Sequence, residues 1–273
     1  MTTRHSNLRR HRAGKSEATV ALFDVGNTNT HIGLANQHRV LRRMEIPTEG
    51  WQSGKAQKAA ASFIQSRMLE GLVVCSVVPA VTPRLVRLAT DLLGLPWLEL
   101  NSKTVRGIGL DYPRPESIGA DRLANAVAVK KHFGSPAVVV DFGTAVTLDV
   151  VDGRGNYVGG IIAPGLSAMT EYLHQKTALL PKIELRPVTA VIGKNTEEAM
   201  RIGAVHGYRG LVKELVQQLQ RALHCRRLPV VATGGYGELI AAHLPIITAY
   251  EPLLTLEGLR LVWQAHQAER VPK

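Results

Sequence analysis

Short apolar runs that end in small polar residues recur along this chain and predict strands joined by tight turns. The first run covers residues 20–23, stops at Asp24 and is followed by Gly26 and the small polar residues 27–30. Apolar residues resume at 32–34. A strand, a tight turn and a second strand explain this order, so we expect a β-hairpin here.

The pattern predicts alternating strands and helices over the rest of the chain. Expected strands cover residues 40–44, 72–78, 97–100 and 230–233, with a further one entering the glycine turn at 159–160. Expected helices cover residues 55–70, 82–93 (capped by Thr82), about 121–132, 166–177, a long stretch opened by Asn195 with Glu198 as its capping partner, and 253–267. Such alternation is typical of an α/β fold.

A second apolar run repeats the first. Residues 137–140 lead into Asp141 and Gly143, with small polar residues after them, and the two aspartates are 117 positions apart. Each also has a threonine six positions further on, Thr30 and Thr147. Self-similarity at this distance indicates duplicated domains.

The chemistry of the turns suits phosphate. Gly26 permits close approach of a ligand to the main chain, and successive N–H groups with nearby hydroxyls form an anion-binding concavity. Asp24 at the strand end can hold a hydrated divalent cation against that phosphate. The plain alternative is a pair of β-hairpins whose polar residues serve only the turns.

Asp121 follows the irregular loop 101–120 and lies at the expected start of a helix. An acidic residue there is often only a partner for the helix dipole, worth about 0.3–1 kcal/mol. Long irregular loops, however, often carry function.

Composition narrows the class of protein. The 273 residues suggest one large or two ordinary domains, and no apolar run approaches the length of a membrane span. No signal-peptide pattern is found, and two cysteines predict a reducing, cytoplasmic setting.

The formal net charge is +11, of which the first 18 residues supply +4, five basic residues against one acidic. We expect residues 1–18 to be a disordered basic arm, and the remaining surplus suits anionic substrates such as ATP or ordinary solubility.

With these residues laid out, the chain resembles the type III pantothenate kinases of the acetate kinase–sugar kinase–Hsp70–actin superfamily over about residues 20–260. Seven motifs occur in family order: Asp24-x-Gly26-Asn27-Thr28 with Gly33, Ser76-Val77-Val78-Pro79, Tyr112 followed by Gly119-Ala120-Asp121-Arg122, Asp141-x-Gly143-Thr144-Ala145, Gly159-Gly160-x-Ile162-x-Pro164-Gly165, Gly193-x-Asn195-Thr196, and Thr233-Gly234-Gly235. Val146, where threonine is usual, is a mild departure.

The resemblance implies duplicated actin-like (ribonuclease H-like) ATPase domains, 19–132 and 133–268, with a cleft between them. It also implies phosphorylation of pantothenate by ATP, the first step of coenzyme A synthesis, with Mg²⁺ and a monovalent cation (K⁺ or NH₄⁺) as cofactors. Family members are homodimers in which the partner subunit helps to close the substrate pocket. We expect a cytoplasmic enzyme with no membrane or nucleic-acid partner.

The resemblance also assigns roles to residues. The ATP phosphate loop would consist of Asp24, Val25, Gly26, Asn27, Thr28, Asn29, Thr30 and His31, with Asp24 near Mg²⁺ through water and Thr144 as a further ATP contact. Asp121 would be the general base. The pantothenate site would be lined by Tyr112, Gly119, Ala120, Asp121, Arg122 and Thr196. Asp141 would bind the monovalent cation.

Two other functions stay open at this point. One is a phosphotransferase on the same scaffold that acts on another small hydroxyl acceptor. The other is a non-catalytic accessory factor for transcription, a name that some proteins of the family have carried. The loop from Tyr112 to Arg122 argues against the first, and the presence of Asp24, Asp121 and Asp141 argues against the second.

Overall fold

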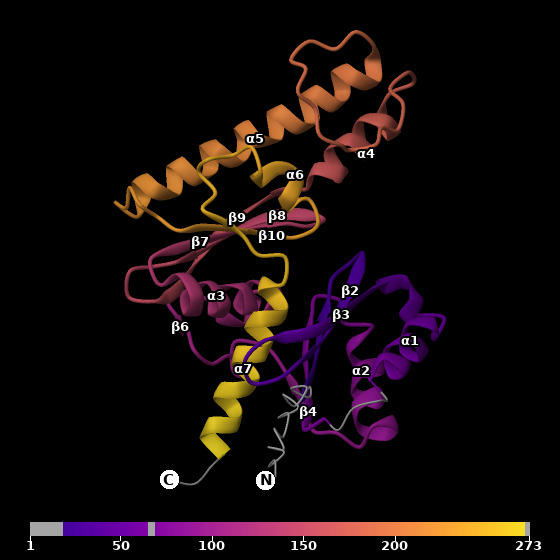
Figure 1. Ribbon diagram of the computed structural model, residues 1–273, viewed down its shortest axis with the longest axis vertical. Coiled ribbons are helices and arrows are strands. Elements are labelled where there is room, and N and C mark those ends of the chain that lie inside the picture. Colours follow the sequence, from indigo (N-terminus) through magenta and orange to yellow (C-terminus); the bar gives the residue numbers. More distant parts are fainter. Residues whose placement is uncertain (1–18, 65–68, 271–273) are drawn as a thin grey trace, which may run out of the picture.

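The computed structural model describes residues 19–64 and 69–270. The basic arm expected over residues 1–18 lies outside this part of the chain. The described chain forms two mixed sheets with helices on their faces (Figure 1).

The first sheet has the strand order β3-β2-β1-β4-β5. Its strands are β1 (Val20–Val25), β2 (Asn29–Ala35), β3 (Val40–Pro47), β4 (Gly71–Ser76) and β5 (Trp97–Glu99). β1, β2 and β3 form an antiparallel meander, and β4 and β5 add in parallel next to β1.

The second sheet, in the order β11-β10-β7-β8-β9-β6, repeats this arrangement. Its strands are β6 (Gly109–Leu110), β7 (Ala137–Phe142), β8 (Ala145–Val151), β9 (Asn156–Pro164), β10 (Val230–Thr233) and β11 (Ala249–Tyr250). β7, β8 and β9 form the meander, β10 and β11 are the parallel additions, and β6 extends the far edge. The duplication predicted from the two aspartates is therefore present in the topology.

Helices cover both faces of each sheet. They are α1 (Lys55–Ile64), α2 (Thr82–Arg87), α3 (Ala120–Phe133), α4 (Leu166–Lys176), α5 (Thr196–Ala222), α6 (Gly237–Ala241) and α7 (Leu254–Arg270), with 3-10 turns at Thr48–Trp51 and Pro115–Ser117. The helices α1 and α2 pack on the outer face of the first sheet, and α5 and α6 on that of the second. The helices α3 and α7 share a core with both sheets and lie between them (Figure 1).

Several local predictions need correction. Thr82 is not the cap of α2, because the helix begins at Thr82 and its cap position is Val81, without a side-chain bond. A π-helical turn, Leu88–Leu92, continues that helix. The first predicted helix, 55–70, is too long, because residues 69 and 70 are not helical, while residues 65–68 fall outside the described residues. Asn195 does cap α5, accepting the Glu198 amide at 2.9 Å, but the Glu198 carboxylate bonds to the Lys194 amide.

The two hairpins differ in length by one residue. Asp24 pairs with His31, seven positions later, whereas Asp141 pairs with Thr147, six positions later. Thr147 is thus the counterpart of His31, and the similarity of Thr30 and Thr147 in sequence does not carry into the register. The difference lies in the turn, because the burial patterns of the flanking strands are the same.

No helix among the described residues is both long enough and apolar enough to cross a membrane.

Candidate functional site

The tips of the two hairpins touch. The hydroxyl oxygens of Thr28 and Thr144 are 3.0 Å apart, although 116 residues separate them in the chain. Each turn is closed by its own backbone bond, from the Gly26 amide to Asn29 and from the Gly143 amide to Ala145. The structure therefore brings the two predicted phosphate-binding turns to one place.

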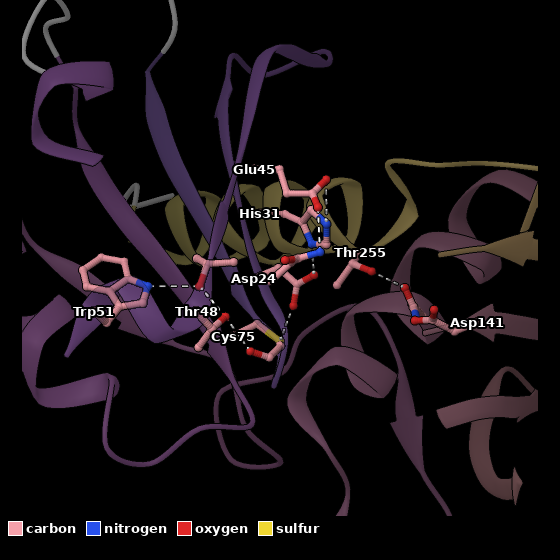
Figure 2. A network of polar contacts seen from close by, with 12 residues as sticks. Asp24, His31, Glu45, Thr48, Trp51, Cys75, Asp141 and Thr255 are labelled. Atoms are coloured by element: carbon pink, nitrogen blue, oxygen red, sulfur yellow. Dashed lines mark hydrogen bonds and ion pairs between the residues drawn. The ribbon is translucent and has the colours of Figure 1, made fainter. Parts of the chain in front are cut away.

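Asp24 lies at the base of the first turn, in a network that Figure 2 shows. One carboxylate oxygen is 3.4 Å from His31 Nδ1, and the other is 3.8 Å from Cys75 Sγ. His31 in turn faces Glu45 at 3.6 Å. The hydrogen bond with Asp24 raises the pKa of His31, and burial raises the pKa of the Cys75 thiol. Asp24 therefore keeps a polar environment on a strand that is otherwise apolar.

Asp141 occupies the equivalent position on β7. Asn125 of α3 donates its amide to the carboxylate at 3.1 Å and accepts a bond from the Thr255 hydroxyl of α7 at 2.9 Å. Burial, together with the charges of Asp121 and Asp24, raises the pKa of Asp141 to about 7. Both central helices are thus tied to this one carboxylate.

Asp121 lies in the first turn of α3, where its Oδ1 accepts the Arg122 amide at 2.8 Å. Burial raises its pKa to about 6, with Asp24 as the next cause. A carboxylate poised near neutrality is suited to proton transfer. Gly119 and Ala120 place this turn: a side chain on Gly119 would meet the Asp121 carboxylate at 2.6 Å.

Arg122 points to Asp149 of β8. Its Nε donates to Asp149 Oδ1 at 2.6 Å, and the carboxylate also accepts the Tyr157 hydroxyl and the Thr147 hydroxyl, both at 3.1 Å. Asp149 is fully buried. Within the described part of the chain, the buried Nη2 of Arg122 finds no hydrogen-bond partner.

Tyr112 joins this group from the irregular loop. Its ring packs edge-on against Tyr157, with centroids 6.0 Å apart. Gly159 gives the ring room, since its backbone has φ +125° and an added Cβ would lie 3.4 Å from Tyr112. The loop residue Tyr112 and Arg122 at the start of α3 therefore both meet the ring of Tyr157.

The residues predicted to bind ATP fall into a buried group and an exposed group. Val25 and Thr30 are at most 1% exposed, so neither offers surface to a ligand. Asn27 and Thr28 at the turn are exposed, and His31 and Asn29 are partly exposed. The first turn is therefore open to a ligand at its tip.

The aspartates of the site fit the binding of cations. Repulsion from the carboxylates of Asp24 and Asp149 contributes to the raised pKa values of Asp121 and Asp141, and of these four described residues Asp149 is the one that pairs with an arginine. Among described residues, however, no three acidic, histidine or cysteine side chains are close enough to hold a metal on their own. A cation here needs further ligands from water or from bound phosphate, which is how proteins usually hold Mg²⁺.

Thr196 does not join the other predicted residues within one chain. It is exposed at the first residue of α5, and Figure 1 shows this end of α5 far from α3, which carries Asp121 and Arg122.

Sequence reasoning missed four residues that complete the site: Asn125, Asp149, Tyr157 and Thr255. The first three lie on elements next to predicted motifs, and Asp149 is a charged residue in an apolar strand. A charged residue in an otherwise apolar strand could have pointed to Asp149, because a fully buried carboxylate requires hydrogen-bonding or charged partners.

Known proteins resemble this chain over most of its length. A family model described as type III pantothenate kinase matches residues 21–218. A type III pantothenate kinase of Methylacidiphilum infernorum is 43% identical over 247 residues, covering 88% of this chain and 86% of the relative. One of Akkermansia muciniphila is 44% identical over 244 residues, covering 89% and 97%.

A solved structure has the same fold at low identity. The activator of the 2-hydroxyisocaproyl-CoA dehydratase from Clostridium difficile, with bound ADPNP, is 11% identical, covers 93% of this chain and 98% of its own, and has a TM-score of 0.52. At that identity the likeness concerns the fold alone, and it agrees with the expected duplicated actin-like arrangement.

Proposed function

Since this chain belongs to the type III pantothenate kinase family, we propose that it transfers the γ-phosphate of ATP to the primary hydroxyl of pantothenate, the first step of coenzyme A synthesis. The observation that carries the proposal is the convergence of Asp24, Asp121 and Asp141 beside two touching turns. This arrangement supports a reaction that needs a base, cation ligands and phosphate-binding amides side by side.

On the donor side, the turns hold ATP. The amides of the first turn and the hydroxyls of Thr28 and Thr144 contact the phosphates from two sides. Asp24 holds Mg²⁺ through water, and Asp141 binds the monovalent cation. These cations neutralise charge on the phosphates, which matters because phosphoryl transfer depends mostly on positioning and electrostatics.

On the acceptor side, Asp121 orients the hydroxyl of pantothenate and accepts its proton. The loose transition state needs little proton transfer early, so a carboxylate of modest basicity suffices. Arg122, Tyr112, Gly119 and Ala120 line the acceptor site. Arg122 contributes a guanidinium that pairs with a carboxylate or with phosphate charge.

We infer a homodimer in which Thr196 reaches the acceptor site of the partner subunit. Thr196 belongs to a family motif, but it begins α5, and this end of α5 lies far from α3, which carries Asp121 (Figure 1). Large apolar side chains are exposed on β9, on α4 and on the segment between α4 and α5: Ile162, Met169, Tyr172, Leu173, Leu179, Val191 and Ile192. A patch of this kind is typical of a protein interface.

Two further expectations remain part of the proposal. The first is a cytoplasmic location, which the reduced cysteines support. The second is the domain division at residues 132 and 133, with the C-terminal domain ending near 268. Helix α7 would then return to pack on β1 and β4 of the first domain.

Release of ADP from ATP tests the function. The rate should depend on added pantothenate and should rise when potassium replaces a large organic cation. A sugar in place of pantothenate should give no rate above background. ADP release that ignores pantothenate would contradict the proposal and favour another acceptor.

A further inference from the structure

A buried threonine stands behind the first turn. Thr48 begins the 3-10 turn after β3 and is 5% exposed. Its amide donates to the Thr28 carbonyl at 2.9 Å, and its hydroxyl donates to the Gly26 carbonyl at 2.8 Å. One residue thus holds two carbonyl groups of the turn.

The Thr48 hydroxyl belongs to a chain of hydrogen bonds in which each group donates to the next, from Trp51 through Thr30 and Thr48 to Gly26. Its proton is used on Gly26, so at its 3.0 Å contact with Thr30 it accepts the Thr30 proton. Thr30 in turn accepts the indole N–H of Trp51 at 3.0 Å (Figure 2 shows the Trp51 end). Thr30 and Trp51 are both fully buried. A satisfied chain in a dry site is stiff, because its members polarise one another.

The geometry of the peptide bond means that, by holding two carbonyl groups, Thr48 also fixes the direction of two backbone N–H groups. In a trans peptide the N–H points opposite to the C=O. The Gly26 carbonyl shares its peptide with the Asn27 amide, and the Thr28 carbonyl shares its own with the Asn29 amide. Because Thr48 holds both carbonyls on one side, those two amides face the other way.

The second turn is built differently at the same position. Pro47 pairs with Asn29 at the start of β2, and Pro164 pairs with Ala145 at the start of β8. Thr48 therefore corresponds to Gly165. A Cβ at Gly165 would lie 2.1 Å from the Thr144 carbonyl, so the shorter second turn fills the space that Thr48 occupies in the first.

We propose that Thr48, held by Thr30 and Trp51, is a positioning residue for ATP: it fixes the first turn so that the amides of Asn27 and Asn29 face the phosphates. The proposal rests on the proposed function in that the first turn is taken as the donor-phosphate site. Thr48 supports only the first of the two turns. Loss of its hydroxyl should therefore weaken the binding of ATP and leave the binding of pantothenate unchanged.

Thr48→Val tests this, since it keeps the shape and removes the hydroxyl. Binding of Mg·ATP, measured by calorimetry without pantothenate, should weaken about tenfold, the effect of one lost hydrogen bond of about 1.4 kcal/mol. The KM for ATP should rise by the same factor, and the KM for pantothenate should stay within about twofold. Thr48→Ser should restore ATP binding, and Trp51→Phe should weaken it about threefold, as expected for a bond one step removed.

Thr248→Val is the matched control. The Thr248 hydroxyl also bonds a backbone carbonyl, that of Val230 at 3.0 Å, at the end of β10 away from the turns. It should lower the melting temperature without changing ATP binding.

Three results would overturn the proposal. The first is unchanged ATP binding in Thr48→Val with only a lower melting temperature. The second, if Thr48→Val fails to fold, is unchanged ATP binding in Trp51→Phe. The third is wild-type protein that does not bind Mg·ATP, which would overturn the proposed function as well. ATP binding without pantothenate-dependent turnover would overturn only the acceptor assignment.

Discussion

The guanidinium of Arg122 and the carboxylate of Asp149 are joined by a 2.6 Å hydrogen bond between the start of α3 and the middle of β8. Asp149 is fully buried, and the Arg122 side chain is 15% exposed. The pair links helix α3, which carries Asp121, to the sheet that carries Asp141. The position of the proposed acceptor site therefore depends on a residue outside every predicted motif.

Asp149→Asn should damage the acceptor site. The amide keeps the size but removes the charge that holds Arg122, and losing one partner of a buried pair typically costs about 3–5 kcal/mol. We expect the KM for pantothenate to rise at least about tenfold, for which about 1.4 kcal/mol suffices, while the KM for ATP stays within about twofold. Steady-state kinetics with each substrate varied checks this.

Tyr157→Phe provides the comparison for that variant. It removes one bond to Asp149 and leaves the charge, so its effect on the pantothenate KM should be smaller. Equal effects of Asp149→Asn on both KM values would mean that the pair supports the fold as a whole.

The activity should fall in acid. Burial raises the pKa of Asp121 to about 6, and its active form is the carboxylate. As the pH drops through about 6, protonation should lower kcat/KM about tenfold per pH unit. A profile of kcat/KM for pantothenate between pH 5 and 8.5 checks this, and a profile flat to pH 5 would contradict the environment described for Asp121.

Asp141→Asn should stabilise the protein without ligands while it removes activity. The folded pKa of Asp141, about 7, lies above its ordinary value of 3.8, so its stabilising effect is present below about pH 4 and is lost as the pH rises through 7. At pH 8 this penalty is of the order of a few kcal/mol, and its removal should raise the melting temperature by about 3 °C or more.

The pH dependence of the melting temperature provides the control for Asp141→Asn. At pH 4 the wild type and Asp141→Asn should melt at nearly the same temperature. A variant that is less stable at pH 8 would show that the charge of Asp141 is fully compensated in the free protein.

A charge in the exposed apolar patch should separate the proposed dimer. Tyr172 is 61% exposed on α4, and Tyr172→Asp places a carboxylate where an interface would exclude water. We expect monomers in light scattering and loss of pantothenate turnover, because Thr196 can then no longer reach a partner site. Leu92→Asp, at a residue equally exposed but on α2's continuation, should leave both unchanged. A monomeric wild type with full activity would contradict the inference.

Much of the fold could be predicted from local pattern. Apolar runs gave the strands of both meanders, and the repeat of Asp24 at Asp141 gave the duplication, because each turn is specified by residues next to it. The sequence could not show that the second turn is one residue shorter. Two threonines at equal spacing suggested the wrong pairing, and only the register with β8 corrects it.

Residues of the candidate site could be predicted where they stand in a sequence motif. They could not be predicted where their contacts join positions far apart in the sequence. Asp121 and Arg122 stand in a motif, but their partners do not. Arg122 meets Asp149 from 27 residues away, and Asn125 meets Thr255 from 130 residues away. Such pairs depend on how α3 and α7 pack between the sheets, which periodicity along one element does not specify.

The central claim is that Asp121 acts as the base for a hydroxyl held beside ATP. Asp121→Asn tests it most directly, since the amide keeps the size and cannot accept the proton. We predict that pantothenate-dependent ADP release falls by at least about a hundredfold, the lower range for a lost general base. Binding of Mg·ATP measured by calorimetry should stay within about twofold of the wild type. Normal turnover in Asp121→Asn would contradict the account.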